Sequence, residues 1–418
     1  TALFNWLWAR RNGGQLVLRI EDTDRTRHVE EALEVILESM KWLGLGYDEG
    51  PYYQSERLDL YKQKAEELLA RDQAYYDTDA EGRKAVRYRV PEGQTAYEDL
   101  VFGRLELAHK DIEDFVILKS DGFPTYNFGC VIDDADMGIT HVIRGNDHLT
   151  NTPKQILLYK ALGLEPPKFA HMCLTLGPDG AKLSKRHGAV AVTSYREMGF
   201  LPEALRNFIA LLGWSPGEDR EIVTLEETIE LFDPKDLNRN PSQFDMEKAL
   251  WMNQQYIMKA ETGELVEPAR AALAAAGHPE EKLTDDFVAG LVSLYRERMK
   301  TFKELAESAG YFFEAPTEYE PKAFKKFLGY EGAPELLEGI VEAIEAAPEF
   351  TAEAIEPKMR EMVEQRGVGF GKLAQAIRVA VTGTKVSPPI FETIELLGRE
   401  ETLERLRRAL EASRAAGE

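Results

Sequence analysis

The chain contains few cysteines and no long apolar run. Its only cysteines are Cys130 and Cys173, each in an apolar stretch, so we expect buried free thiols in a reducing compartment. No residues have the spacing of zinc ligands, so no metal site is expected. No apolar run approaches the roughly 18 residues of a membrane-spanning helix. The start of the sequence lacks a secretory apolar region, so we expect a cytoplasmic protein.

Basic residues are outnumbered by acidic ones. The chain has 51 Lys and Arg against 73 Asp and Glu, which gives a formal net charge of −22. This balance argues against a general nucleic-acid binder, because phosphate contacts need basic residues. It does not exclude recognition of one folded RNA, which needs basic patches rather than a basic protein.

The signatures of covalent catalysis and of common nucleotide-binding loops are also missing. The sequence shows no Ser/His/Asp or Cys/His arrangement, no G-x-G-x-x-G and no P-loop. Covalent and metal-centred catalysis are therefore weak hypotheses.

Apolar periodicity divides the chain into an α/β part and a helical part. Strands alternate with helices at first, which is typical of a parallel sheet, but short strands between about 75 and 120 predict an inserted antiparallel module. Beyond about residue 195 the patterns predict helices only, and the length of 418 residues indicates more than one domain. The predicted strands are 15–20, 86–90, 101–108, 115–119, 139–144 and 169–176, and the predicted helices include 1–11, 29–40, 56–71, 152–162, 201–213 and one behind a capping box at 224–227.

The first predicted helix has no start signal. Its apolar face begins at Leu3 without a capping residue before it, and the glycines after Asn12 end it. We therefore interpret the chain as a fragment that lacks the residues before Thr1.

The most informative segment is 182–186 (KLSKR), which follows a Gly-Pro-Asp-Gly turn. Lys182 and Lys185, with Ser184 between them, can reach the phosphates of a nucleotide and neutralise charge on departing pyrophosphate. The alternative is a solvated basic loop, the commoner meaning of such a segment alone.

A second segment, Glu21 to Asp24, follows the first predicted strand. Ligands of open α/β sheets bind at the carboxyl ends of strands, and a carboxylate there suits an ammonium group. Alternatively, Thr23 or Asp24 caps the next helix and the segment is only a loop.

Two further segments offer polar side chains near predicted strand ends. Arg144 can grip a carboxylate through two hydrogen bonds, and Asp147 or His148 can bond a ribose or an amino group. The alternative is a salt bridge of Arg144 within an ordinary loop. Tyr126 either points its hydroxyl at a polar ligand or belongs to the core.

Together these four segments closely resemble those of the bacterial glutamyl-tRNA synthetases, a family of class I aminoacyl-tRNA synthetases. The order and approximate spacing are kept through nearly the whole chain, and the likeness includes 201–205, 251–253 and 371–373. Segment 182–186 corresponds to the KMSKS element of the family. Asp24-Arg25 is glutamyl-type, where glutaminyl relatives typically have asparagine-proline.

The resemblance implies a fold and a reaction. The fold is an α/β Rossmann-type parallel sheet with an inserted α+β domain, followed by an all-α anticodon-binding half. The reaction activates L-glutamate with ATP to glutamyl-adenylate and then transfers the glutamyl group to the 3′ end of tRNA(Glu). The implied domains are two Rossmann halves (1–74 and 121–190), an acceptor-binding insert (75–120), a stem-contact region (191–250) and two anticodon-binding domains (251–335 and 336–418).

The resemblance also implies individual roles. Lys182 and Lys185 match catalytic, phosphate-binding lysines, and Arg298 matches an arginine that helps read the third anticodon base. Magnesium is expected with ATP, zinc is not, and we expect a monomer. The implied glutamate-binding residues are Glu21, Tyr126, Cys130 and Arg144, and the implied ATP-binding residues are Asp147, Thr175, Lys182, Ser184, Lys185 and Arg186.

Three departures from the family leave alternatives open. The first, HIGH-type motif is missing before Thr1, the insert is some tens of residues short between Thr78 and Ala85, and Asn146 stands where an acidic residue is common. A non-catalytic RNA-binding paralogue would explain the missing motif, although the other site residues are intact. A non-discriminating enzyme that also charges tRNA(Gln) is the alternative within the same chemistry.

Overall fold

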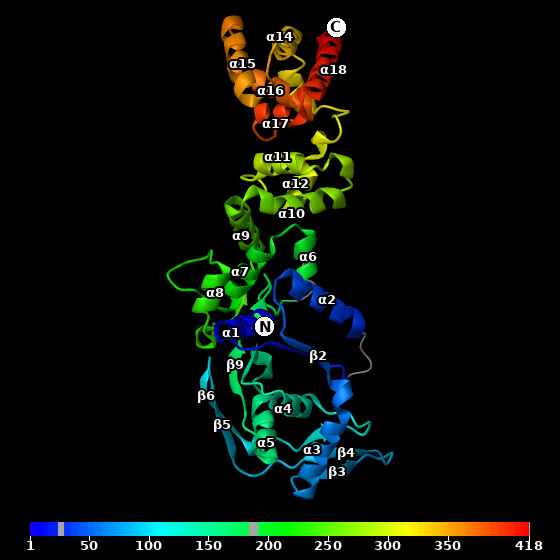
Figure 1. Cartoon of the computed structure of the whole chain (residues 1–418), viewed down its shortest axis with the longest axis vertical. Coiled ribbons are helices and arrows are strands. Elements are labelled where there is room, and N and C mark those ends of the chain that lie inside the picture. The colour runs from blue at the N-terminus through cyan, green and yellow to red at the C-terminus, as the bar shows by residue number, and fades with distance from the viewer. Residues whose placement is uncertain (24–28, 184–190, 418) are drawn as a thin grey trace. The chain divides into compact units, whose positions relative to one another are not determined.

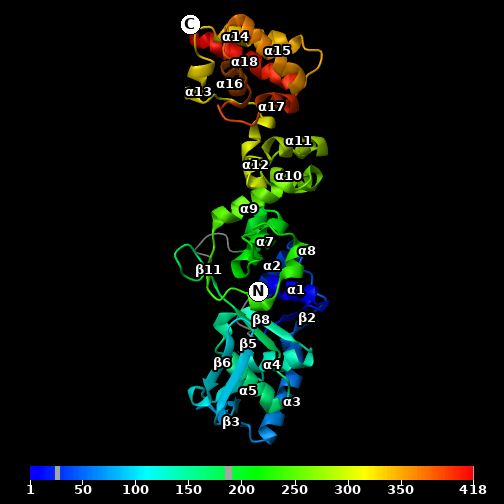
Figure 2. The ribbon, with the colours of Figure 1, turned by 90° about the vertical axis from the view of Figure 1, so that its left-hand side faces the viewer.

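The computed structural model describes residues 1–23, 29–183 and 191–417. The chain forms two compact units, of which unit 1 comprises residues 1–195 and 202–249, and unit 2 comprises 196–201 and 250–418 (Figures 1 and 2). None of the described helices is long and apolar enough to span a membrane.

The first 259 residues alternate between strands and helices. The elements are α1 (Ala2–Arg11), β1 (Val17–Ile20), α2 (Val29–Trp42), β2 (Glu49–Tyr53), α3 (Leu58–Ala70), β3 (Ala74–Thr78), β4 (Lys84–Tyr88), β5 (Gln94–Asp99), β6 (Gly103–Ala108), β7 (Phe115–Leu118), α4 (Tyr126–Asp136), β8 (His141–Gly145), α5 (Thr152–Leu162), β9 (Lys168–Met172), β10 (Thr175–Leu176), α6 (Val192–Glu197), α7 (Pro202–Gly213), α8 (Leu225–Leu231), β11 (Ser242–Gln243) and α9 (Met246–Lys259).

Parallel strand pairs confirm the predicted α/β character of unit 1. β1 pairs with β2 and β8 pairs with β9, both in parallel, in separate hydrogen-bonded sheets. Pro153 near the start of α5 and Gly163 after its end, with a φ of 70°, bound that helix as predicted. The polar segments after β1 and β8 therefore follow the carboxyl ends of parallel strands.

The inserted module is antiparallel, as predicted, but one predicted strand is wrong. Residues 101–108 do not form one strand, because Asp99 accepts hydrogen bonds from the amides of Val101 and Phe102 and closes a turn between β5 and β6. Gly103, with a φ of 76°, completes this turn. β3, β4 and β7 form the other antiparallel sheet, and β5 also joins β9, giving the strand order β6-β5-β9-β8.

The core of this part lies among α3, α4 and α5 and the strands beside them, including the buried Tyr61, Phe128 and Leu158. The prediction missed α4, which begins at Tyr126. The capping box at Thr224 is confirmed, since its hydroxyl accepts from the amide of Glu227 and the Glu227 carboxylate accepts from the amide of Thr224.

The regular elements of unit 2 are all helices over its described residues, as predicted. After α9 its helices are α10 (Thr262–Ala275), α11 (Asp285–Tyr295), α12 (Phe302–Ser308), α13 (Pro321–Phe327), α14 (Ala333–Glu345), α15 (Ala352–Arg366), α16 (Phe370–Thr382), α17 (Ile390–Leu397) and α18 (Arg399–Gly417). Apolar faces of α13 to α18 enclose one core that includes Leu337, Ile377 and Leu406.

Candidate active site

The acidic segment after β1 presents one carboxylate towards solvent. The Asp22 carboxylate accepts hydrogen bonds from the amide and hydroxyl of Ser55 at 2.8 and 2.5 Å, so it holds the following turn in place. The side chain of Glu21 is 41% exposed, and an Arg19 nitrogen lies 3.9 Å from its Oε1. Glu21 is therefore the acidic side chain of this segment that can meet a ligand, while Asp24 lies outside the described residues.

A buried ionic network fixes the base of this segment. Arg19 Nη1 donates to Asp134 Oδ1 at 2.8 Å, and the fully buried Asp133 accepts from Gln54, Arg57 and Tyr61 at 2.8–3.0 Å. Burial alone would lower the pKa of Arg19, but the neighbouring carboxylates outweigh it and raise that pKa. The guanidinium therefore stays charged and ties the end of β1 to α4.

Tyr126 and Cys130 lie one turn apart on α4. The Tyr126 side chain is partly exposed, and its ring centroid lies 5.3 Å from that of His148, so this tyrosine is not a core residue. Cys130 is buried and its thiol donates to Glu21 Oε1 at 3.2 Å. Burial, with the Glu21 carboxylate beside it, raises the pKa of Cys130, so the thiol stays protonated. Cys173 is also free but only half-buried, so the prediction of buried thiols holds fully for Cys130 alone.

Arg144, on β8, is held by neutral acceptors. Its Nε donates to His171 Nε2 at 3.1 Å, and its Nη2 donates to Thr152 Oγ1 and Gln155 Oε1 at 2.7 and 2.9 Å. No carboxylate of the described residues forms an ion pair with it, so the salt-bridge alternative finds no support there.

The same side chains act on each other electrostatically, which places them in one cluster. Burial raises the pKa of Tyr126, with further influence from Cys130, Arg144 and Glu21. Burial and Arg144 lower the pKa of His148, so its imidazole is neutral near pH 7. We call Glu21, Tyr126, Cys130 and Arg144 the amino-acid cluster.

The segment after β10 carries the first lysine of the KLSKR motif. Lys182 Nζ lies 3.1 Å from Asp147 Oδ2, and the two side chains are 63% and 44% exposed. Burial raises the pKa of Asp147, but Lys182 outweighs it and the pKa lies below its ordinary value. The Thr175 carbonyl accepts from the Leu183 amide at 3.0 Å, and the predicted turn before the motif is present. Ser184, Lys185 and Arg186 lie outside the described residues, as does His187.

Arg298 lies in unit 2, in the connection after α11. Its amide donates to the Tyr295 carbonyl at 2.8 Å. Burial and the nearby Arg298 guanidinium together lower the pKa of Arg378 on α16. Two like charges thus approach each other here, and no described carboxylate forms an ion pair with either of them.

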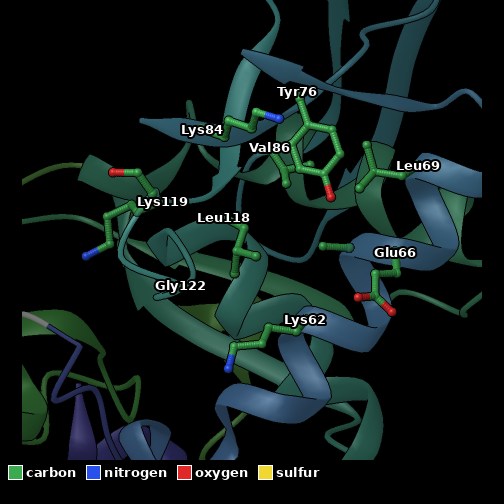
Figure 3. A pocket seen from close by; sticks show the side chains of 11 residues that line it. Lys62, Glu66, Leu69, Tyr76, Lys84, Val86, Leu118, Lys119 and Gly122 are labelled. Carbon is green, nitrogen blue, oxygen red and sulfur yellow. The ribbon is translucent and has the colours of Figure 1, made fainter. Parts of the chain in front are cut away.

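A cavity of about 200 Å³ opens elsewhere in unit 1, between α3 and the β3-β4-β7 sheet (Figure 3). The Tyr76 ring stands beside Leu69 and Val86 there, and Lys62 and Lys84 line the cavity with them (Figure 3). None of the predicted site residues lines this cavity.

Several residues of the site were not predicted. Asp133 and Asp134 lie in a helix that the sequence pattern did not reveal. His171 offered a signal, because a histidine in a predicted buried strand needs polar partners. Asp99 offered none, since the contact with His171 joins residues far apart in the sequence.

Comparison with known proteins agrees with this arrangement. The family model described as "tRNA synthetases class I (E and Q), catalytic domain" matches residues 1–83 and 76–251, and the model "Anticodon binding domain" matches residues 258–410. The glutamate–tRNA ligase of Thermodesulfovibrio yellowstonii is 45% identical, with 99% of this chain and 96% of the relative aligned. Glutamate–tRNA ligase 1 of Alkalilimnicola ehrlichii is 44% identical over 98% and 94% of the two chains.

The solved structures agree with the sequence relatives. A glutamate–tRNA ligase from Elizabethkingia meningosepticum, crystallised with its amino acid, superposes with a TM-score of 0.89 at 31% identity, over 98% of this chain and 95% of that one. The alignment with the T. yellowstonii enzyme runs over 447 positions, more than the 418 residues present, so that relative carries residues that this chain lacks. The two catalytic-domain matches overlap at 76–83, which covers the end of β3 and the connection to β4, where the sequence predicts a shortened insert. The chain belongs to the glutamate–tRNA ligases, a family of class I aminoacyl-tRNA synthetases.

Proposed function

We propose that this protein attaches L-glutamate to tRNA(Glu) in two steps. In the first step a glutamate carboxylate oxygen attacks the α-phosphorus of ATP, and the bond from that phosphorus to pyrophosphate breaks. In the second step a ribose hydroxyl of the terminal adenosine attacks the glutamyl carbonyl, its proton is lost, and AMP leaves. Neither step needs a protein nucleophile, so positioning and charge stabilisation supply the rate enhancement.

The amino-acid cluster binds glutamate in this proposal. The exposed Glu21 carboxylate takes the α-ammonium group, and Arg144 takes a carboxylate of the substrate. The partly exposed Tyr126 forms a wall, and the protonated Cys130 thiol lies at the far end. This arrangement is supported by the contacts of Arg144, whose three hydrogen-bond acceptors at Nε and Nη2 are all uncharged and which has no carboxylate partner among the described residues.

The second group of residues binds ATP. Asp147 and Thr175 contact the nucleoside, while Lys182, Ser184, Lys185 and Arg186 contact the phosphates. Lys182 Nζ lies 3.1 Å from Asp147 Oδ2, and both side chains are exposed. Because an exposed ion pair is weak, the Lys182 ammonium can leave Asp147 and bind a phosphate of ATP instead. Magnesium arrives with the phosphates of ATP as part of the substrate.

Unit 2 reads the anticodon in this proposal, through Arg298 among other residues. The mutual repulsion of Arg298 and Arg378 supports this role, because an electronegative base edge or a phosphate would relieve it. We assign residues 1–74 and 121–190 to the catalytic domain, 75–120 to acceptor binding, 191–250 to stem contact, and 251–335 and 336–418 to anticodon binding. We also propose a cytoplasmic monomer.

The observation that carries the proposal is the pairing of an exposed carboxylate, Glu21, with a guanidinium, Arg144, that lacks a carboxylate partner. Together they complement a ligand that has both an ammonium and a carboxylate group. Transfer of labelled glutamate from solution to purified tRNA(Glu), in the presence of ATP, tests the proposal directly. We expect acid-precipitable label with tRNA(Glu), and none when glutamine replaces glutamate.

The same assay separates the alternatives. Equal charging of tRNA(Gln) with glutamate would identify a non-discriminating enzyme. Binding of tRNA without any charging would favour the RNA-binding paralogue and contradict the proposed catalysis.

A further inference from the structure

We infer that His171 and Asp99 are positioning residues that orient the guanidinium of Arg144 for its substrate carboxylate. This inference rests on the proposed function, because it requires Arg144 to bind glutamate. It adds two residues, from β9 and from the inserted module, that would not touch the substrate themselves.

The three side chains form one continuous hydrogen-bonded chain. Asp99 Oδ2 lies 2.6 Å from His171 Nδ1, and His171 Nε2 lies 3.1 Å from Arg144 Nε. The side chains of Asp99 and His171 have no exposed surface, so water does not compete for these bonds. A fully buried carboxylate would be costly without such partners.

The contacts decide which nitrogen of His171 carries the proton. An arginine Nε can only donate, so His171 Nε2 must accept and must be unprotonated. Thr152 Oγ1 lies 3.1 Å from the same nitrogen, and its hydroxyl can donate to it as well. The proton is therefore on Nδ1, which donates to Asp99. Burial raises the pKa of Asp99, but the bond from His171 and two backbone amides outweigh it and lower that pKa. The carboxylate thus remains an acceptor and holds the imidazole in this tautomer.

A neutral imidazole separates the Asp99 carboxylate from the Arg144 guanidinium, and this separation favours binding of a substrate carboxylate by Arg144. A carboxylate placed directly against Arg144 would pair with it and would compete with the glutamate carboxylate. The actual acceptors, His171, Thr152 and Gln155, are all buried and uncharged, and they engage Nε and Nη2. The guanidinium is thereby fixed in direction by uncharged acceptors, and the Tyr126 hydroxyl of the amino-acid cluster is a further neutral neighbour.

Asp99 is itself held firmly. Its Oδ1 accepts from the amides of Val101 and Phe102 at 3.0 and 2.9 Å. The residue ends β5 and pairs with Phe169 on β9, so the inserted module and the catalytic strands meet at this carboxylate.

The substitution Asp99→Asn tests the inference with little change of shape. The Asn oxygen must stay where the two backbone amides donate to it, so its NH₂ group faces His171 Nδ1. That nitrogen must then accept, the proton moves to Nε2, and an N–H group opposes the N–H of Arg144. We expect the KM for glutamate in ATP–pyrophosphate exchange to rise about tenfold or more, with the KM for ATP unchanged.

A spectroscopic measurement separates positioning from a general structural effect. In ¹⁵N-histidine spectra, the wild-type protein should show the Nδ1–H form of His171, and Asp99→Asn the Nε2–H form. Asp114→Asn is the matched control, because the Asp114 carboxylate also accepts from a backbone amide, that of Val90, within the inserted module. This control should leave both KM values and the tautomer unchanged.

The substitution Arg144→Gln distinguishes a failure of the positioning role from a failure of the proposed function. If Arg144→Gln raises the KM for glutamate but Asp99→Asn does not, the positioning role is wrong and the proposed function stands. If Arg144→Gln also leaves that KM unchanged, the assignment of Arg144 to glutamate fails, and this inference fails with it. A parallel rise of both KM values in Asp99→Asn would show general damage and would likewise overturn the inference.

Discussion

Replacement of Arg144 by lysine changes geometry while keeping the charge. The arginine fork donates to three acceptors, at 3.1, 2.7 and 2.9 Å, and in the proposed function it also binds a substrate carboxylate. A lysine ammonium offers three donors from one atom and cannot hold His171, Thr152 and the substrate in these directions at once. At least one charge-assisted hydrogen bond to glutamate is therefore lost or misdirected.

The size of the effect follows from that bond. A hydrogen bond to a charged group contributes about 1.5–3 kcal/mol, which corresponds to roughly a 10- to 150-fold change in binding. We expect the KM for glutamate of Arg144→Lys to rise within this range in ATP–pyrophosphate exchange, while the KM for ATP stays unchanged. Arg71→Lys is the matched control, because Arg71 donates to the Ala161 carbonyl in the same unit. A KM for glutamate equal to that of the wild type would refute the assignment of Arg144.

Four further predictions concern charge and stability. Lys182→Ala should raise the KM for ATP and leave tRNA affinity in filter binding unchanged; equal loss of both would mean misfolding. Arg298→Gln should relax discrimination at one anticodon base, which charging of anticodon variants of tRNA(Glu) would reveal as altered ratios. Asp133→Ala removes the fully buried carboxylate that accepts from Gln54, Arg57 and Tyr61, and should cost about 3–5 kcal/mol in urea unfolding; a loss below about 1 kcal/mol would contradict the buried network. The pKa of Asp99 is lower in the folded state than its ordinary 3.8, so its contribution to stability is complete above that value and is lost as pH falls through the folded pKa. The stability gap between wild type and Asp99→Asn should therefore shrink from pH 7 to pH 3, and a constant gap would contradict the pairing.

Sequence patterns predicted the parallel α/β character of unit 1 and the helical unit 2 because these have strong local signals. α5 begins with a proline and ends with a left-handed glycine, and the capping box at Thr224 is a four-residue motif. The elements that were missed have weak signals: β2 contains Gly50-Pro51, and the turn after Asp99 depends on a side-chain contact to the backbone.

The candidate site was only partly accessible to sequence reasoning. The resemblance to a known family identified Glu21 and Arg144 as candidate site residues. Their predicted positions near the carboxyl ends of strands gave a physical reason for both, because ligands of open α/β sheets bind there. The partners of Arg144 could not be predicted, because His171 and Asp99 meet only when β5 and β9 pair. Local patterns carry no information about such long-range contacts.

The most direct test of the account is tRNA-stimulated ATP–pyrophosphate exchange by the purified protein, with glutamate and glutamine compared in parallel. We expect exchange with glutamate and none with glutamine. Failure to support exchange with either amino acid, by a folded protein that binds tRNA(Glu), would contradict the proposed catalysis.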